Sequence, residues 1–187
     1  MSSRARLISS KVLYDGRVVR LRLDQVIEPG GVRAAREVVA HPGSVVVMPC
    51  LADGRVVLVR QFRYAVGQSL WELVAGSLKP GERPLAAARR ELVEETGYRA
   101  RKFNLLLKFF PSPGFLSEEM HLVEALELTL AKAEPEEDER IEVGRFTRTE
   151  LREMMASGKI RDGKTLIGLL WLLGSRQRAP GRRSGRS

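Results

Sequence analysis

The segment from Pro84 to Gly97 constrains the fold more than any other part of this sequence. Residues 85–96 are rich in Ala, Leu, Arg and Glu, which are strong helix formers. A proline is accepted in the first turn of a helix, so Pro84 can begin one. Gly97 stands where a left-handed residue commonly ends a helix. The sequence therefore predicts a helix over residues 84–96.

The predicted helix has an apolar side. With a rotation of about 100° per residue, one stripe along the helix carries side chains suited to the core of the protein. This stripe consists of Leu85, Ala88, Leu92 and Thr96. We expect it to pack against a sheet.

A second flank of the same helix collects acidic side chains. Glu91 and Glu95 lie one turn apart, with Glu94 beside them, and Arg90 can pair with Glu94 four residues later. Carboxylates this close repel one another unless solvent or a cation neutralises them. Mg²⁺ prefers oxygen ligands and shares them with phosphates. The flank is a candidate metal site, and a solvated surface is the alternative that the helix alone leaves open.

The spacing around this helix resembles the Nudix box. The pattern is Gly76, five residues, Glu82, seven residues, Arg90-Glu91-Leu92, one residue, Glu94-Glu95, one residue, Gly97. Tyr98 follows where the family usually has an aliphatic residue, and we expect its ring to be buried. The resemblance implies an α+β protein, an α/β/α sandwich with a mixed β-sheet, in which the box forms a loop–helix–loop.

The same resemblance implies roles for residues of the box. Glu91 and Glu95 match the main metal ligands, the backbone carbonyl of Ala75 often completes the shell, and Glu94 assists catalysis. The matching structural positions are Gly76, Glu82, Arg90 and Gly97, with Glu82 and Arg90 bracing the loop against the helix. The implied cofactor is Mg²⁺, with Mn²⁺ as an alternative, and the implied reaction is attack of water on a phosphorus of a nucleoside diphosphate derivative.

Other residues resemble the ADP-ribose pyrophosphatase branch of the family. Pro113 lies sixteen residues after Gly97, and Ser112-Pro113-Gly114 continues to Glu118. An ordinary Pro/Gly loop is the alternative. Three further fragments look like the same branch, namely Val59–Arg63, Glu72–Gly76 and Asp162–Leu166. The resemblance implies that Pro113 lies at the substrate and that Arg63 contacts the diphosphate, although Arg63 can also be read as a surface charge at a strand end.

The catalytic base is expected in an acidic loop, residues 134–140, before a late strand. Counted back from Ile141, Glu137 matches the family's water-activating glutamate and Glu139 matches an additional metal ligand. A shift of one residue moves the role to Glu136 or Asp138, and Glu118 is a rival base. A run of acidic residues in a loop is otherwise a solvated segment.

Patterning divides the chain into three parts. Residues 1–43 read as an antiparallel β subdomain, residues 44–174 as the catalytic domain, and residues 175–187 as a basic, disordered tail. The later strands expected include Leu70–Val74, Phe103–Phe109 and Ile141–Phe146, and Thr147 with Glu150 predicts a capping box. In relatives of this branch the N-terminal sheet packs across a two-fold axis, which implies a homodimer in which Arg17, Val19 and Glu28 surround the partner's adenine.

Composition limits the remaining classes. The net charge of +9 falls to +4 without the five arginines of the tail, which lacks interleaved aromatic residues, so nucleic acid is not expected as a partner. The single cysteine, Cys50, reads as a packed thiol. The run Leu166–Leu173 is too short to span a bilayer, and no apolar signal core is visible near Met1. We expect a cytoplasmic protein with no membrane partner.

The sequence therefore predicts a Mg²⁺-dependent hydrolase that converts ADP-ribose to AMP and ribose 5-phosphate. Another nucleoside diphosphate sugar or an oxidised nucleotide is an alternative substrate. A Nudix-like nucleotide-binding module without catalysis is the alternative of a different class.

Overall fold

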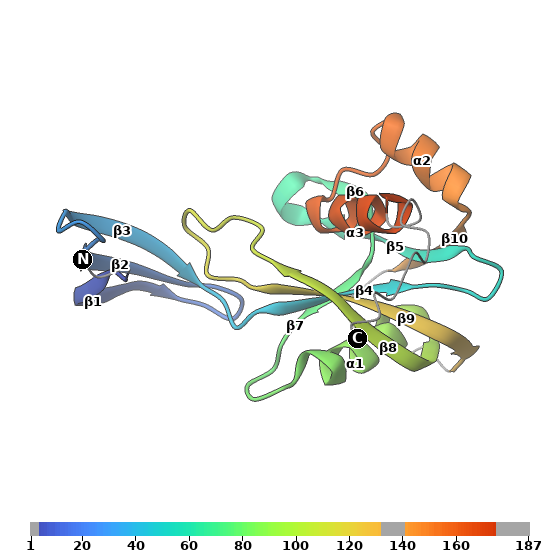
Figure 1. The fold of residues 1–187 in the computed structure, drawn as a ribbon, viewed down its shortest axis with the longest axis horizontal. Helices are drawn as coiled ribbons and strands as arrows, with labels where there is room; N and C mark the ends of the chain where they lie inside the picture. Colours follow the sequence, from blue (N-terminus) through green and yellow to red (C-terminus); the bar gives the residue numbers. More distant parts are fainter. Residues whose placement is uncertain (1–3, 132–140, 175–187) are drawn as a thin grey trace, which may run out of the picture.

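A computed structural model describes residues 4–131 and 141–174 of the chain (Figure 1). The elements follow in the order β1 (Arg6–Asp15), β2 (Arg20–Ile27), β3 (Arg33–Ala40), β4 (Ser44–Pro49), β5 (Val56–Arg63), the 3₁₀ turn η1 (Tyr64–Val66), β6 (Gln68–Glu72), β7 (Val74–Ser77), α1 (Pro84–Thr96), β8 (Tyr98–Phe109), β9 (Met120–Leu130), β10 (Glu142–Phe146), α2 (Arg148–Ala156) and α3 (Gly163–Gly174). The acidic loop and the basic tail considered above lie outside the described residues.

Two sheets form the body of the protein. One has the strand order β7-β4-β9-β8 and is mixed, because β4 runs parallel to β9 and antiparallel to β7. The other has the order β10-β5-β6 and is antiparallel. In the first sheet, α1 packs against one face and α3 against the other (Figure 1). The α/β/α sandwich of the α+β class is confirmed.

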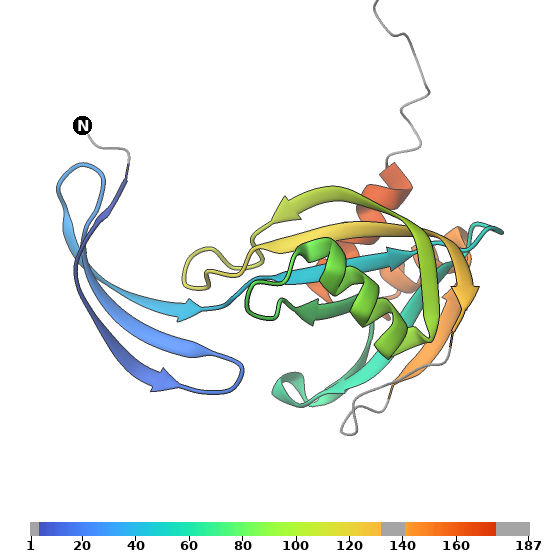
Figure 2. The same ribbon diagram turned by 90° about the horizontal axis from the view of Figure 1, so that it is seen from below.

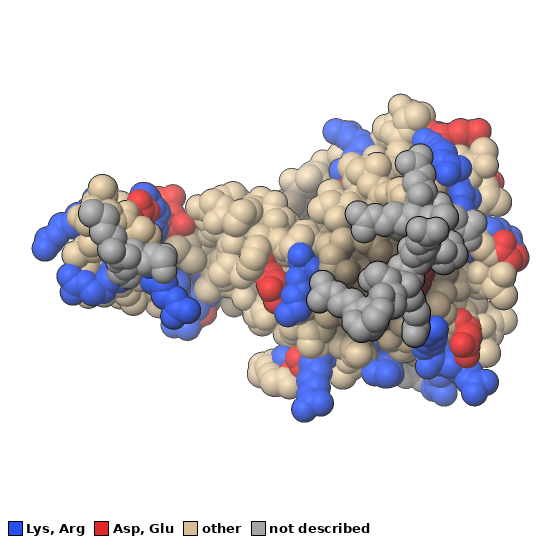
Figure 3. Space-filling view, viewed as in Figure 1, with Lys and Arg blue, Asp and Glu red and all other residues tan. Residues whose placement is uncertain are grey.

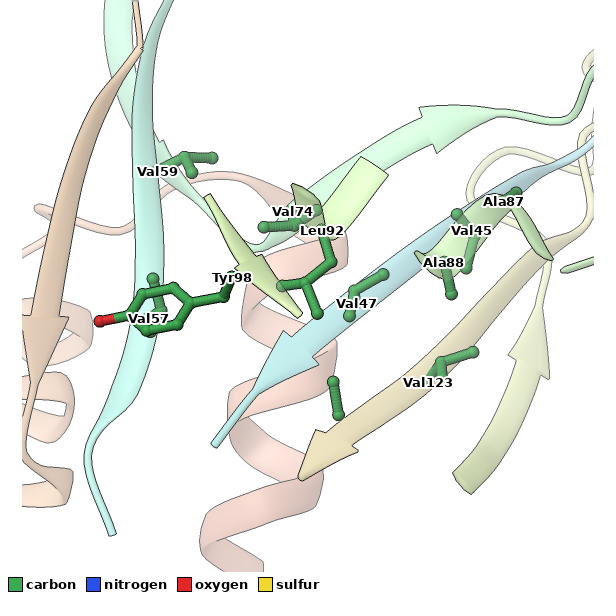
Figure 4. Packing of buried hydrophobic residues seen from close by; sticks show 11 residues of the cluster. Val45, Val47, Val57, Val59, Val74, Ala87, Ala88, Leu92, Tyr98 and Val123 are labelled. Carbon is green, nitrogen blue, oxygen red and sulfur yellow. The ribbon is translucent and has the colours of Figure 1, made fainter. Parts of the chain in front are cut away.

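Strand β4 is buried on both faces, and alternate residues supply two separate cores. Val45 and Val47 pack with Leu92 of α1 (Figure 4), while Val46 and Met48 pack in a second cluster that includes residues of α2 and α3. A strand covered on both sides is expected to be apolar throughout, as this one is. The β4 strand is thus the centre to which the helices on either side are attached.

Helix α1 has the predicted ends, with Pro84 as its first residue. Gly97 adopts a left-handed conformation at φ 68°, and its amide donates to the carbonyl of Val93 at 2.9 Å. The prediction that Leu85 belongs to the core is wrong, because 37% of that residue is exposed. The buried face is rotated toward the acidic flank and consists of Ala87, Ala88, Leu92, Glu95 and Thr96. The acidic flank therefore borders the sheet.

The single strand predicted over Leu70–Val74 is two strands. The chain leaves the second sheet at the end of β6 and enters the first sheet at β7, with a break at Leu73. The amide of Leu73 donates to Oγ1 of Thr165 at 2.8 Å, so a residue at the start of α3 replaces the strand partner. A break of this kind cannot be seen in an apolar pattern, since Leu73 and Val74 are both fully buried.

Two other local predictions are confirmed. Thr147 and Glu150 form the capping box of α2, in which the Thr147 side chain accepts from the Glu150 amide at 3.2 Å and the Glu150 carboxylate accepts from the Thr147 amide at 2.7 Å. The ring of Tyr98 is buried in the core beside α1 (Figure 4). Strand β8, however, begins at Tyr98 and not at Phe103, because the chain enters the strand directly after the helix cap.

Strands β1, β2 and β3 form an antiparallel sheet that extends away from the body (Figures 1 and 2). Every residue of β1 is exposed. Lysine and arginine side chains gather on this sheet (Figure 3), and two of the arginines, Arg22 and Arg36, pair with Asp24 and Glu28. Among residues 4–131 and 141–174 no helix has both the length and the apolar character needed to cross a membrane.

Candidate active site

The first element of the site is a close contact between β7 and α1. A Cβ atom on Gly76 would lie 1.8 Å from Oε1 of Glu91, so the carboxylate fills the place where any other residue would have a side chain. Glycine is required here by the close approach and not by a left-handed backbone, since Gly76 is absent from the positive-φ glycines. Glu91 is held against the strand next to Ala75 by this contact.

Arg90 joins the loop before α1 to the acidic flank of the helix. Its Nε and Nη2 donate to the two carboxylate oxygens of Glu82 at 3.1 and 2.9 Å. Its Nη1 donates to Glu91 at 2.6 Å and to Glu94 at 3.0 Å. Hydrogen bonds with Glu82 and then with the other two carboxylates raise the pKa of Arg90, against the opposing effect of burial. Glu82 and Arg90 lie as the expected bracing pair.

The loop before α1 and the helix together supply four carboxylates near Arg90. Arg90 is shared by three carboxylates, and Glu95, only 8% exposed, lies one turn beyond Glu91 on the same helix. In the described ranges no three His, Cys, Asp or Glu side chains are close enough to hold a metal ion as they stand. Arg90 is the counter-ion of Glu91 and Glu94 in this arrangement. The available donors are carboxylate oxygens, one of which lies in the space left by Gly76 (the cradle), and hard divalent cations prefer such oxygen ligands.

A second group of charges surrounds Glu72 at the end of β6. Arg63, the last residue of β5, donates through Nε and Nη2 to the two oxygens of Glu72 at 2.7 and 2.9 Å. Lys164 also donates to Glu72, and to Asp162 at 2.9 Å. Burial raises the pKa of Glu72, but hydrogen bonds from Arg63 and the charge of Lys164 outweigh it and hold that pKa below its ordinary value. The three fragments singled out in the sequence meet here.

Arg63 interacts electrostatically with Glu95 of α1. Its hydrogen bonds with Glu72 are the largest influence raising its pKa, and the negative charges of Glu95 and Asp162 add to that rise. The Arg63 side chain is 40% exposed, whereas Glu72 is 1% exposed. The Arg63 side chain is therefore bound to a buried carboxylate and also has access to solvent.

Glu118 lies beside the start of the box. Its carboxylate is 3.6 Å from Nδ1 of His41, and Nε2 of the same ring is 3.3 Å from Oγ of Ser77, the last residue of β7. Both side chains are largely buried. The structure thus brings one of the two proposed positions of the base to the end of the strand that carries Gly76. The other position, Glu137, and the predicted additional metal ligand, Glu139, lie outside the described residues.

Pro113 and Glu28 lie on one hollow between the N-terminal sheet and the loop after β8. The hollow has a volume of about 380 Å³, and Arg36, the partner of Glu28, also lines it. The loop is fastened to β3, because the amide of Val39 donates to the carbonyl of Phe115 at 2.8 Å. Arg17 is exposed in the turn between β1 and β2, at the opposite end of β2 from Glu28.

Sequence reasoning missed two participants, Lys164 and His41. The fragment Asp162–Leu166 was noted without a role for Lys164, which the structure places on Glu72. His41 was given no role, and its ring lies 3.6 Å from the Glu118 carboxylate and 3.3 Å from Oγ of Ser77. The sequence shows that Lys164 follows Asp162 by two residues. It does not show that Lys164 also lies beside Glu72.

Comparison with known proteins places the chain in a family. The NUDIX domain family model matches residues 40–166. The ADP-ribose pyrophosphatase of Bacillus subtilis (strain 168) is 36% identical over 167 residues, which cover 88% of this chain and 90% of that protein. The methanol dehydrogenase activator of Bacillus methanolicus is 37% identical over 167 residues, with the same shares of 88% and 90%. A crystal structure of an ADP compounds hydrolase shares the fold, with a TM-score of 0.80 and 22% identity over 94% of this chain and 97% of the other. The chain belongs to the NUDIX domain family.

Proposed function

We propose that the protein is a Mg²⁺-dependent hydrolase that cleaves the diphosphate of ADP-ribose to AMP and ribose 5-phosphate. The observation that carries the proposal is the acidic flank of α1, whose Glu91 carboxylate lies in the cradle left by Gly76. The 36% identity to an ADP-ribose pyrophosphatase across most of both chains supports the choice of substrate. A binding module without catalysis would have no need for carboxylates that crowd one another in this way.

Glu91 and Glu95 would hold the metal, Mg²⁺ or Mn²⁺, together with the backbone carbonyl of Ala75, and Glu94 and Glu139 would assist. When bound, such an ion polarises phosphoryl oxygens and offsets the charge that develops on them. Glu91 can serve only if its carboxylate is shared with Arg90 or turns away from it, because Nη1 now lies 2.6 Å from Oε1. Arg90 then keeps Glu82 and Glu94 as partners.

The remaining groups act on the substrate and on water. Arg63 would donate to the diphosphate, for which its planar, permanently charged guanidinium is suited. A carboxylate would orient a water molecule and accept its proton. Glu118 and Glu137 remain the two positions proposed for this base. Glu118 lies near the end of β7, with its carboxylate 3.6 Å from Nδ1 of His41, and this location supports Glu118.

We also propose a homodimer built on residues 1–43, with residues 44–174 as the catalytic domain. Strand β1 is long, and among the described residues no strand pairs with its outer edge; such edges pair readily with another chain. Apolar side chains are exposed on this sheet, including Leu7, Ile8, Val12, Leu13, Tyr14, Val18, Val19 and Val32. A second copy would cover them and would bring Arg17, Val19 and Glu28 to the partner's substrate.

Release of AMP from ADP-ribose tests the proposed reaction. We expect AMP in the presence of Mg²⁺ and none after EDTA, since the carboxylates alone cannot offset charge on a diphosphate. The products are measured by chromatography or by phosphate release in a coupled phosphatase assay, with GDP-mannose and UDP-glucose as competing substrates. Faster turnover of another nucleotide sugar would change the assigned substrate and leave the assigned reaction unchanged. Absence of turnover on the whole panel would contradict the enzyme assignment.

Replacement of Glu95 by Gln separates catalysis from folding. We expect turnover to fall by about a hundredfold or more, because a metal ligand loses its charge. The melting temperature should be similar or higher, because a repulsion with neighbouring carboxylates is relieved. Glu153→Gln, an exposed acid on α2, is the matched control and should leave turnover unchanged. Unchanged turnover in Glu95→Gln would count against the metal assignment.

Replacement of Gly76 by Ala tests the cradle. The new methyl group would overlap the Glu91 carboxylate, which is the end of a flexible side chain and can move, so we expect a small change in melting temperature. Affinity for Mn²⁺, measured by calorimetry, should fall by about tenfold or more because one ligand is displaced. Gly174→Ala, whose methyl group meets nothing within 4 Å, is the control. Equal Mn²⁺ affinity in wild type and Gly76→Ala would remove the cradle from the proposal.

The dimer is tested by light scattering after size-exclusion chromatography. We expect a mass of twice the 20.9 kDa of one chain. Leu13→Asp on β1 should shift the protein to monomer, because it places a charge in the proposed interface. Leu105→Asp on β8 is the control, since Leu105 is 49% exposed and Leu13 is 47% exposed. A wild-type monomer at micromolar concentration would exclude the dimer.

A further inference from the structure

Glu72 is a buried carboxylate with more cationic partners than its own charge requires. Its side chain is 1% exposed, and a buried carboxylate must be neutralised. The two parallel hydrogen bonds from Arg63 already do this. Lys164 contributes a second positive charge on the same carboxylate and is itself paired with Asp162. The four groups form a row of alternating charge, Arg63–Glu72–Lys164–Asp162.

Arg63 is the member of this row that faces outward. Glu72, Lys164 and Asp162 are all largely buried, whereas the Arg63 side chain is 40% exposed. The guanidinium turns its Nε–Nη2 edge to Glu72, so its remaining N–H groups point away from that carboxylate. This end of the row can donate to an anion outside.

Lys164 can neutralise the Glu72 carboxylate when Arg63 donates to such an anion. With Arg63 as its sole partner, Glu72 would compete with an incoming diphosphate for the guanidinium. Because Lys164 stays on the same carboxylate, Glu72 remains neutralised while Arg63 shares its charge.

The row is anchored in the first turn of α3. The Asp162 carboxylate accepts from the amide of Thr165 at 2.9 Å and from its Oγ1 at 2.6 Å. Oγ1 of Thr165 in turn accepts from the amide of Leu73. The turn therefore contacts both Glu72 and the residue after it, so the Glu72 carboxylate has a support in addition to Arg63.

We propose that Lys164 and Asp162 are positioning residues for substrate binding: they fix Glu72, and Glu72 aims the guanidinium of Arg63 at the diphosphate. This inference rests on the proposed function, because it takes a nucleoside diphosphate as the ligand of Arg63. It adds a role for three residues that would not touch the substrate.

The test compares Lys164→Met with Lys164→Arg, using ADP as the probe. The dissociation constant of ADP is measured by calorimetry in EDTA, and KM and kcat are measured for ADP-ribose with Mg²⁺. We expect Lys164→Met to raise the dissociation constant and KM by about tenfold while kcat changes by less than about twofold, since ground-state binding is lost. Lys164→Arg keeps the charge and should restore both values.

The control is Arg60→Met, which removes a cation from the same strand as Arg63. Arg60 pairs with Glu142 at 3.3 Å on the surface, and neither residue belongs to the Arg63–Glu72–Lys164–Asp162 row. It should leave the ADP dissociation constant unchanged. Asp162→Asn is the second variant if Lys164→Met does not fold, and it should weaken ADP binding in the same direction by a smaller factor.

Two results with the variants would overturn the inference. One is an ADP dissociation constant in folded Lys164→Met equal to that of wild type, which would leave Lys164 with a role in stability alone. The other is an equal loss in Lys164→Arg and Lys164→Met. A wild-type protein that binds neither ADP nor ADP-ribose would also overturn it. Weaker ADP binding in Lys164→Met, combined with no AMP release by wild type, would refute the proposed reaction and retain the inference.

Discussion

The close approach of α1 to the backbone of β7 is the constraint on which the rest of the site depends. Any side chain at position 76 would take the place of the Glu91 carboxylate. The helix can come this near because Ala87 and Ala88 are its buried contacts with the core, and both are fully buried. Larger side chains there would force α1 away from β4 and β7. The acidic flank borders the sheet because three small residues allow it.

Arg90 holds the carboxylates of the loop and of the acidic flank together. Without a cation, Glu82, Glu91 and Glu94 would repel one another, and the loop before α1 would lose its attachment. A lysine could not make the same set of contacts, because the guanidinium reaches several carboxylates through N–H groups held in one plane. Together with Glu95 on the same helix, these three carboxylates form a set of oxygen donors that suits an added divalent cation.

Sequence reasoning succeeded where the determinants are local. The ends of α1, the Glu82–Arg90 pair and the capping box at Thr147 follow from spacings of a few residues, which the backbone geometry translates directly into contacts. It wrongly predicted that Leu85 is buried, because helical periodicity identifies an apolar stripe but does not show which part of that stripe contacts the sheet. It could not place Lys164 on Glu72, since 92 positions separate them.

The segment from Glu72 to Gly76 connects the two halves of the site. Its first residue holds Arg63, and its last residue holds Glu91 against the strand. From Val74 to Gly76 the segment is paired with β4, and at Leu73 it is bound to Thr165, so its backbone is held at both places. The backbone therefore limits how far the attachment points of Arg63 and Glu91 can move apart. In the proposed function, Arg63 and a metal ion on the acidic flank bind the same diphosphate, so their separation has to match the distance between its two phosphoryl groups. The clamp of Thr165 on Leu73 fixes the end of the segment from which Arg63 is aimed.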